Sequence, residues 1–430
     1  MKTFLQPLQN LAEMEEIQKQ AKKNRGILEI SGCMESQKAH LMYGLSGLFP
    51  CHLVIAADEK SAKELYEDYR FYDKRVYYYP AKDLLFFQAD IHGNLLIRQR
   101  MQVIRALLER EDEITVVTSI DGCMDYLAPL EKIEKQLIYF RNDSTLDMDK
   151  LTAALVHMGY ERVGQVEMPG QFSIRGGIID IYSLTEENPW RIELWGDEID
   201  SIRSFDAQSQ RSLENLDDVT IYPAAEQPME KNGVSFLDYF KETETLFFLD
   251  ELNHLEENAK AVQEEFQQSC ENRKEKGEIS LSGDWMCTWE ELCHKINDRN
   301  CVAMSLLDPK KSNWKISGQF NITVKSMSSY QSSFELLVKD LKQYKKEGYQ
   351  IVLLSGSRTR AERLAKDLQE EGLNAFYGQD SDRILQPGEI MVAYGHARRG
   401  FEYPLVKFAV ITETDIFGKE QKKRKKKKEY

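Results

Sequence analysis

The residues best suited to chemistry in this chain run from Gly32 to Ala39 and match part of a phosphate-binding loop. A working loop reads G-x-x-x-x-G-K-[ST]. Its glycines let backbone N–H groups approach the phosphates, its lysine contacts the terminal phosphates, and its hydroxyl binds magnesium. Gly32 and Lys38 are present, but Gln37 and Ala39 replace the second glycine and the hydroxyl. These replacements argue against ATP hydrolysis, and an ordinary strand-to-helix turn carrying an unrelated lysine explains the same spacing.

A second candidate is the segment LFFLDE, Leu246 to Glu251, which has the form of a Walker B strand. In such a strand the aspartate holds magnesium and the glutamate polarises water, roles that would fall to Asp250 and Glu251. The pattern is weak by itself, because many buried strands end in solvated acids.

A third candidate is the segment from Trp190 to Trp195, along which polar and apolar side chains alternate. In a strand, Arg191, Glu193 and Trp195 would share one face and the residues between them the other. If the apolar set faces the core, an arginine and a tryptophan lie on an exposed face, a composition enriched at interfaces. The alternative is that Trp195 is buried. Arg175 precedes two glycines that allow a bulge or close backbone approach.

The elements that must position these residues follow an α/β pattern. Short apolar runs alternate with amphipathic helical patterns over residues 1–132, which predicts a parallel sheet covered by helices. Residues 133–223 predict an inserted α+β domain with a helix capped by Ser144 or Thr145. Residues 224–318, opening with a helix at VSFLDYF, return to the first domain. Residues 319–417 form a second small α/β domain, in which Gly372 caps a helix.

Composition restricts the remaining possibilities. The formal net charge is −14, but residues 419–430 carry eight basic and two acidic side chains, which leaves −14 − 6 = −20 for the rest. An acidic body argues against broad DNA binding, so we interpret residues 418–430 as a basic linker, with a nucleic-acid arm as the alternative. Neither a membrane span nor a signal peptide is visible, which predicts a cytoplasmic protein. The seven scattered cysteines predict neither disulfides nor a metal site.

The run from Pro169 to Ala224 resembles a stretch shared by UvrB, of bacterial nucleotide excision repair, and the transcription-repair coupling factors, the Mfd family. The closing run FEYPLVKFAVITETDIFGKEQKKRKKKKEY resembles the coupling factors in particular. The resemblance covers essentially the whole chain as the N-terminal, UvrB-like region of that family. It implies an α/β fold: a degenerate RecA-type parallel domain, an inserted α+β domain with a mixed or antiparallel sheet, and a second small α/β domain.

The resemblance also implies a function. The segment Gly32 to Ala39 corresponds to an intact phosphate loop in UvrB, so Gly32, Lys38, Asp250 and Glu251 look like remnants of a lost ATPase site. No cofactor is then expected in this chain, because ATP and magnesium serve the translocase motor of the family protein. RNA polymerase and DNA are likewise bound by downstream domains without a counterpart here, which suggests that the chain stops before them.

In the family the insert is the docking surface for the damage sensor UvrA. The family residues implicated there match Arg175, Arg191 and an aromatic residue that is Trp195 here, where Phe is usual. The expected function is therefore a UvrA-recruiting module without catalytic residues, which links RNA polymerase stalled at DNA lesions to excision repair. Two rivals stay open: an active UvrB-type damage-verification ATPase, and a nucleic-acid-binding module that uses the basic tail.

Overall fold

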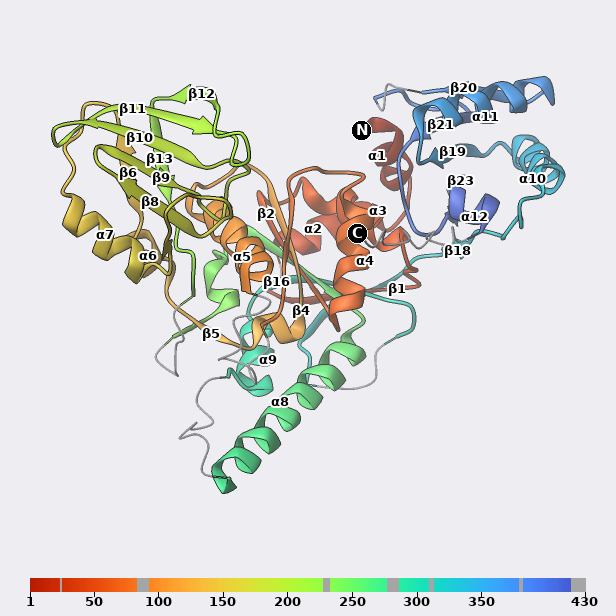
Figure 1. The fold of residues 1–430 in the computed structure, drawn as a ribbon. Helices are drawn as coiled ribbons and strands as arrows, with labels where there is room; N and C mark the ends of the chain where they lie inside the picture. The colour runs from red at the N-terminus through yellow and green to blue at the C-terminus, as the bar shows by residue number, and fades with distance from the viewer. Residues whose placement is uncertain are drawn as a thin grey trace. The chain divides into compact units, whose positions relative to one another are not determined.

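The computed structural model describes residues 1–23, 25–82, 93–226, 233–276, 286–308, 313–378 and 382–418 (Figure 1). The basic segment 419–430 lies outside these ranges, so the choice between linker and nucleic-acid arm is not tested. The chain divides into two compact units. The first comprises Met1–Val76, Glu244–Leu255 and Cys293–Tyr430, and the second comprises Tyr77–Thr243 and Glu256–Leu292.

The first unit holds most of a seven-stranded sheet with the order β17-β1-β16-β15-β2-β4-β3. The pairings β1–β16, β1–β17, β15–β16 and β15–β2 are all parallel. Strands β1 and β15 are buried along their whole length, as expected for a parallel sheet covered on both faces. The seven strands are β1 (Gly26–Ser31), β2 (Cys51–Ala56), β3 (Val76–Tyr79), β4 (Ile114–Ser119), β15 (Thr245–Asp250), β16 (Asn300–Ser305) and β17 (Ile316–Asn321).

Four helices of the first unit accompany this sheet: α1 (Lys2–Gln9), α2 (Met14–Lys23), α3 (Gln37–Ser46) and α4 (Glu59–Tyr69). Helix α3 follows β1 directly, as a phosphate loop requires. Helix α4 begins after Asp58, whose carboxylate accepts the backbone N–H of Ser61 and so caps the first turn. Both helices are therefore positioned by the ends of the strands that precede them.

The first unit also contains a second sheet, which we call the sheet of the small α/β domain. Its order is β18-β22-β23-β19-β21-β20, and β19 pairs in parallel with both β21 and β23. Its strands are β18 (Lys325–Ser326), β19 (Gln350–Ser355), β20 (Asn374–Tyr377), β21 (Glu389–Tyr394), β22 (Phe401–Tyr403) and β23 (Phe408–Thr412). Its helices are α10 (Phe334–Glu347), α11 (Arg358–Glu370) and α12 (Glu413–Phe417). Gly372 has φ of 78° and follows Glu371, the residue that occupies the C-cap of α11.

The second unit contains the insert, built on a six-stranded sheet with the order β12-β11-β10-β9-β8-β7. All its pairings are antiparallel except β7–β8. Helix α7 (Met148–His157) contributes Leu151 and Leu155 to the core beneath this sheet. The insert strands are β6 (Ile138–Arg141), β7 (Glu161–Arg162), β8 (Gln171–Arg175), β9 (Ile178–Ile181), β10 (Trp190–Trp195), β11 (Glu198–Phe205), β12 (Ser212–Leu216) and β13 (Asp218–Ile221).

The remaining elements lie largely in the second unit: α5 (Gly93–Leu108), η2 (Ile120–Cys123), β5 (Tyr126–Leu127), α6 (Leu130–Glu134), β14 (Val234–Ser235), η3 (Phe236–Tyr239), α8 (Leu252–Glu275) and α9 (Trp289–Asn297). The predicted fold class, a parallel α/β domain with an antiparallel insert and a second α/β sheet, is confirmed. None of the helices described here is long and apolar enough to cross a membrane.

Two local predictions are wrong. Helix α7 is capped by Asp147, which accepts the N–H of Lys150, because Thr145 is held in a β-bridge with Glu198 and its backbone stays outside the helix. The segment predicted as a helix at 234–240 is the short strand β14 followed by one 3-10 turn. Phe236, Leu237 and Tyr239 of that turn are buried and only Asp238 is exposed, so the turn lacks the broad polar face of a longer surface helix.

Candidate functional site

The segment that matches part of a phosphate loop, Gly32 to Ala39, leads from β1 into α3. Gly32 has φ of 83°, and a Cβ atom there would lie 2.1 Å from the carbonyl oxygen of Ile322, so only glycine fits. Gln37 occupies the second glycine position and is completely buried. Its Oε1 accepts the backbone N–H of Met34 at 3.0 Å. A backbone donor of the loop is thus bound by the side chain at the second glycine position of the pattern.

Other donors of the loop are also engaged inside the protein. The N–H of Gly32 donates to the carbonyl of Leu306 at 3.2 Å, and that of Cys33 donates to Ser305 at 3.0 Å. A phosphate loop works because several such N–H groups point at one anion. Here their partners are protein acceptors.

The lysine of the loop is paired with the acids of the Walker B-like strand. Lys38 Nζ lies 2.6 Å from Asp250 Oδ1 and 2.7 Å from Glu251 Oε1. Burial by itself would lower the pKa of Lys38, but the two carboxylates outweigh it and the pKa is raised above its usual value. The structure therefore brings together Lys38, Asp250 and Glu251, the three residues that the family resemblance placed in one site.

The electrostatics of this cluster disfavour a phosphate. Two carboxylates face one ammonium group, and Glu251 also accepts the N–H of Leu306 at 3.0 Å. A nucleotide would have to break the lysine pairs and approach the excess negative charge. The arrangement is suited to joining α3, which carries Lys38, to the end of β15 through a largely buried ion cluster.

The second candidate site is the outer face of the insert sheet, the face opposite the core. Trp190 and Ile192 are buried, whereas Trp195 is 83% exposed. The first of the two readings of this strand is therefore confirmed, and the alternative with Trp195 buried is wrong. Arg175 at the end of β8 and Arg191 on β10 also lie on the outer face, because both bind the same carboxylate there.

That carboxylate belongs to Asp180 of β9, whose side chain is 1% exposed. Arg191 donates from Nε to Oδ1 at 2.7 Å and from Nη2 to Oδ2 at 2.9 Å, and Arg175 donates from Nη2 to Oδ2 at 2.7 Å. The strand register places Asp180 directly opposite Arg191. A single buried acid thus fixes both arginines.

The two arginines differ in what they present to solvent. Arg191 is 15% exposed, packs over the ring of Phe205 at 4.4 Å and donates to Gln210. Arg175 is 47% exposed. The face can therefore offer a partner the Arg175 guanidinium and the Trp195 indole, whereas Arg191 is mostly withdrawn from solvent. Beside these groups Arg203 forms an ion pair with Glu193.

Three further residues of this face, Asp180, Phe205 and Gln210, were not predicted from the sequence patterns. Asp180 had a usable signal, because it is the one acid in the apolar run IIDI and falls on the polar side of the alternation. Phe205 and Gln210 follow in β11 and the turn after it, and nothing local indicates that they meet Arg191. Among the described residues no group of three or more His, Cys, Asp or Glu side chains is placed to hold a metal ion.

Comparison with known proteins first defines the class. Residues 138–226 match the family model of the UvrB interaction domain. This range begins with β6 and extends past β13, so it covers the insert, including Arg175, Asp180, Arg191 and Trp195. The chain therefore carries a UvrB-type interaction domain within an α/β fold.

Longer matches extend the similarity beyond the insert. The chain is 29% identical over 473 aligned residues to the transcription-repair-coupling factor of Bacillus subtilis (strain 168), covering 93% of this chain and 40% of that protein. It is 26% identical to that of Staphylococcus haemolyticus (strain JCSC1435), covering 82% and 34%. With Staphylococcus aureus (strain MRSA252) the identity is 25%, covering 82% and 35%. The predicted resemblance to the N-terminal, UvrB-like region of transcription-repair coupling factors is confirmed.

The chain spans 40% or less of the length of these relatives. Among solved structures, a chain described as "DEAD-box helicase Mss116 bound to ssRNA and UDP-BeF" matches at 9% identity with a TM-score of 0.24, covering 92% of this chain and 64% of that chain.

Proposed function

We propose that this chain is the UvrA-recruiting, ATPase-inactive, UvrB-like module of a transcription-repair coupling factor. The observation that carries the proposal is the outer face of the insert. It lies within the range that matches the UvrB interaction domain, and it presents Arg175 and Trp195 to solvent over the buried carboxylate of Asp180.

The chemistry of this face suits a protein partner with an acidic and an apolar patch. A guanidinium group held in place by one carboxylate can still donate to another, and arginine binds carboxylates with defined geometry. A largely exposed indole has much apolar surface in contact with water, and this surface is removed from water only when a partner covers it. UvrA is the partner that the family resemblance implies for Arg175, Arg191 and Trp195.

The absence of ATPase activity is supported by the loop. Gln37 fills the second glycine position, Ala39 has no hydroxyl for magnesium, and Lys38 is committed to Asp250 and Glu251. Titration calorimetry with Mg·ATP and a phosphate-release assay with DNA present test this part. We expect neither binding nor turnover. A magnesium-dependent ATP complex, or DNA-stimulated turnover that Lys38→Ala abolishes, would favour the UvrB-type ATPase instead.

The wider role extends the proposal to the whole family protein. In it, ATP, magnesium, RNA polymerase and DNA are bound by domains other than this module, and the module brings UvrA to a polymerase stalled at a lesion in the cytoplasm. The direct experiment is titration of purified UvrA into this chain. Binding that depends on Arg175, Arg191 and Trp195 supports the proposal, whereas binding insensitive to all three would overturn the site assignment.

A further inference from the structure

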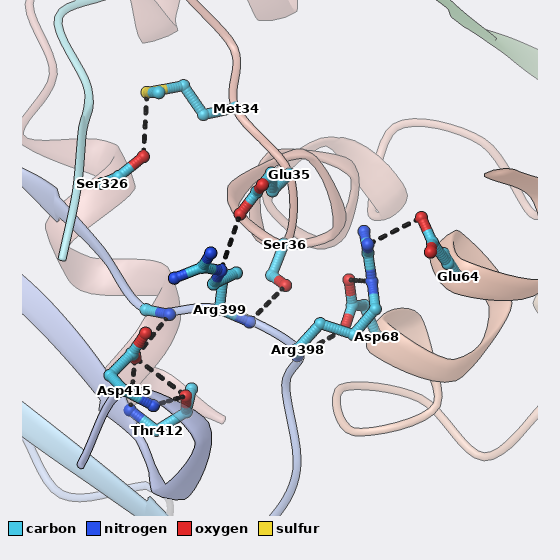
Figure 2. Close-up of polar contacts among 11 residues, drawn as sticks. Met34, Glu35, Ser36, Glu64, Asp68, Ser326, Arg398, Arg399, Thr412 and Asp415 are labelled. Carbon is cyan, nitrogen blue, oxygen red and sulfur yellow. Dashed lines mark hydrogen bonds and ion pairs between the residues drawn. The ribbon is translucent and has the colours of Figure 1, made fainter. Parts of the chain in front are cut away.

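The degenerate phosphate loop has a close neighbour that the function proposed above does not use. Residues 398–403, which we call the docking segment, lead into and form β22 of the small α/β domain. Figure 2 shows this segment passing beside the loop, with Arg398 and Arg399 directed at acids of the first α/β domain. Three consecutive loop residues, Glu35, Ser36 and Gln37, contact it.

The first of these contacts, between Glu35 and Arg399, introduces a negative charge into the loop. A phosphate loop is a cradle for anions, but Glu35 places a carboxylate in it. Glu35 has φ of 31°, a conformation rare for a residue with a side chain, and its Oε2 lies 3.7 Å from Arg399 Nε (Figure 2). The backbone N–H of Arg399 also donates to Ser36 Oγ at 3.1 Å. The loop therefore pairs its own acid with a cationic side chain, the opposite charge arrangement to that of an anion-binding loop.

Arg398 makes three hydrogen bonds to acids of α4. Asp68, at the end of α4, has a side chain with 0% exposure, and it accepts both the backbone N–H of Arg398 at 2.9 Å and its Nε at 3.1 Å (Figure 2). Glu64, one turn earlier, accepts from Arg398 Nη1 at 2.7 Å. A buried carboxylate needs such donors, because leaving it unpaired is costly. Asp68 thus depends on a residue 330 positions away.

The third contact is a buried chain of hydrogen bonds. Gln37 Nε2 donates to the hydroxyl of Tyr403 at 2.9 Å. His40 Nε2 lies 2.7 Å from the carbonyl of Phe4, so it must carry the proton, and Nδ1 then accepts from Tyr403 at 3.1 Å. Gln37, at the second glycine position of the loop, is therefore one end of a hydrogen-bond network in which each donor and acceptor is assigned.

The docking segment is shaped by its own domain before it reaches the loop. Asp415 Oδ2 accepts the N–H of Gly400 at 2.7 Å and that of Thr412 at 2.9 Å, which fixes the segment to the start of α12 (Figure 2). A Cβ atom at Gly400 would lie 2.4 Å from both Asp415 Oδ2 and the carbonyl of Val410. The bend after Arg399 is therefore built into the small α/β domain.

We propose that the former phosphate loop is now the docking site for the small α/β domain of the same chain, with residues 398–403 as its occupant. The residues that spoil the loop for a nucleotide, Glu35 and Gln37, are the ones that bind the segment. In this proposal residues 398–403, and not a nucleotide, occupy the loop. The two α/β domains are therefore joined without ATP. This inference does not depend on UvrA.

Hydrogen exchange of the intact chain, followed by mass spectrometry, tests the docking. In Arg398→Ala/Arg399→Ala we expect backbone amides of residues 33–42 to exchange at least about tenfold faster, because their cover opens more often. Strands β19 and β23 should keep their protection, which shows that the domain itself stays folded. Arg360→Ala is the matched control. Arg360 pairs with Glu413 inside the small α/β domain, so its removal should leave the exchange rates of residues 33–42 unchanged.

A charge-reversal pair keeps the test valid if the double alanine variant unfolds. Arg399→Glu places two acids beside each other and should speed hydrogen exchange of residues 33–42. Adding Glu35→Arg should return the exchange rate to that of the wild type. Both side chains are about half exposed, so neither change buries a charge. Unchanged exchange of residues 33–42 in folded variants would overturn the proposal. Protection of the loop by Mg·ATP in the wild-type chain, with faster exchange at 398–403, would overturn it as well.

Discussion

Arg191 and Asp180 form a two-point ion pair across neighbouring strands, with Nε–Oδ1 at 2.7 Å and Nη2–Oδ2 at 2.9 Å. The pair lies mostly out of solvent, and Arg175 shares its acid. An arginine that the family resemblance assigns to partner binding is therefore also part of the support of the sheet. Its role in the sheet and its role in partner binding can be distinguished only if the free energy of unfolding and the affinity for UvrA are both measured.

For this reason Arg191→Ala should change two quantities. We expect the free energy of unfolding to fall by roughly 1–3 kcal/mol, because Asp180 keeps only Arg175 as a partner. We expect UvrA affinity to fall by roughly 2 kcal/mol as the outer face loses its order. Urea denaturation and titration calorimetry give the two values. A loss of affinity at full stability would show that Arg191 touches UvrA without supporting the sheet.

Lys38→Ala should destabilise the fold without affecting partner binding. It leaves the buried Asp250 and the partly exposed Glu251 without their cation, for which the expected loss is roughly 3–5 kcal/mol in the free energy of unfolding. The comparison is Lys63→Ala, which removes an exposed pair with Glu59 and should change stability by no more than about 0.5 kcal/mol. UvrA affinity should match the wild type in both. Equal stability of the two variants would show that the Lys38 cluster is not closed as described.

His40 should make stability depend on pH. Burial lowers the pKa of His40 to about 4 in the folded chain, against roughly 6.5 when unfolded. Above pH 6.5 both states are neutral. As pH falls from there toward 4, only the unfolded chain takes up the proton, so stability should decrease by roughly 3 kcal/mol. Urea denaturation across this range, compared with His40→Gln, isolates the effect. Identical profiles for the two chains would contradict it.

Deleting residues 419–430 should leave UvrA affinity unchanged if this segment is a linker. The deletion removes a net charge of +6, eight basic against two acidic side chains, so any binding to DNA through the segment would be lost together with its salt dependence. Titration with UvrA and with duplex DNA at two salt concentrations distinguishes these outcomes. A drop in UvrA affinity on deletion would assign the segment to the interface.

The sequence could predict features that depend on local period and spacing. Alternation predicted that Arg191 and Trp195 share a face. The family resemblance, rather than either pattern alone, implied that Lys38 and Asp250 belong to one site. It could not predict contacts between distant segments, such as Asp68 with Arg398, because neither residue carries a local signal of its partner. The cap of α7 was missed for a related reason: Thr145 is a good capping residue, but a bridge to the distant Glu198 keeps it in extended structure.

Trp195→Ala tests the central claim most directly, because this side chain is 83% exposed and its removal should change the free energy of unfolding by no more than about 0.5 kcal/mol. Titration calorimetry with UvrA should show an affinity loss of roughly 2 kcal/mol, about 30-fold. Tyr139→Ala, an exposed aromatic on β6, is the control and should bind as the wild type does. Wild-type affinity in Trp195→Ala, with the chain folded, would contradict the proposed UvrA-binding face.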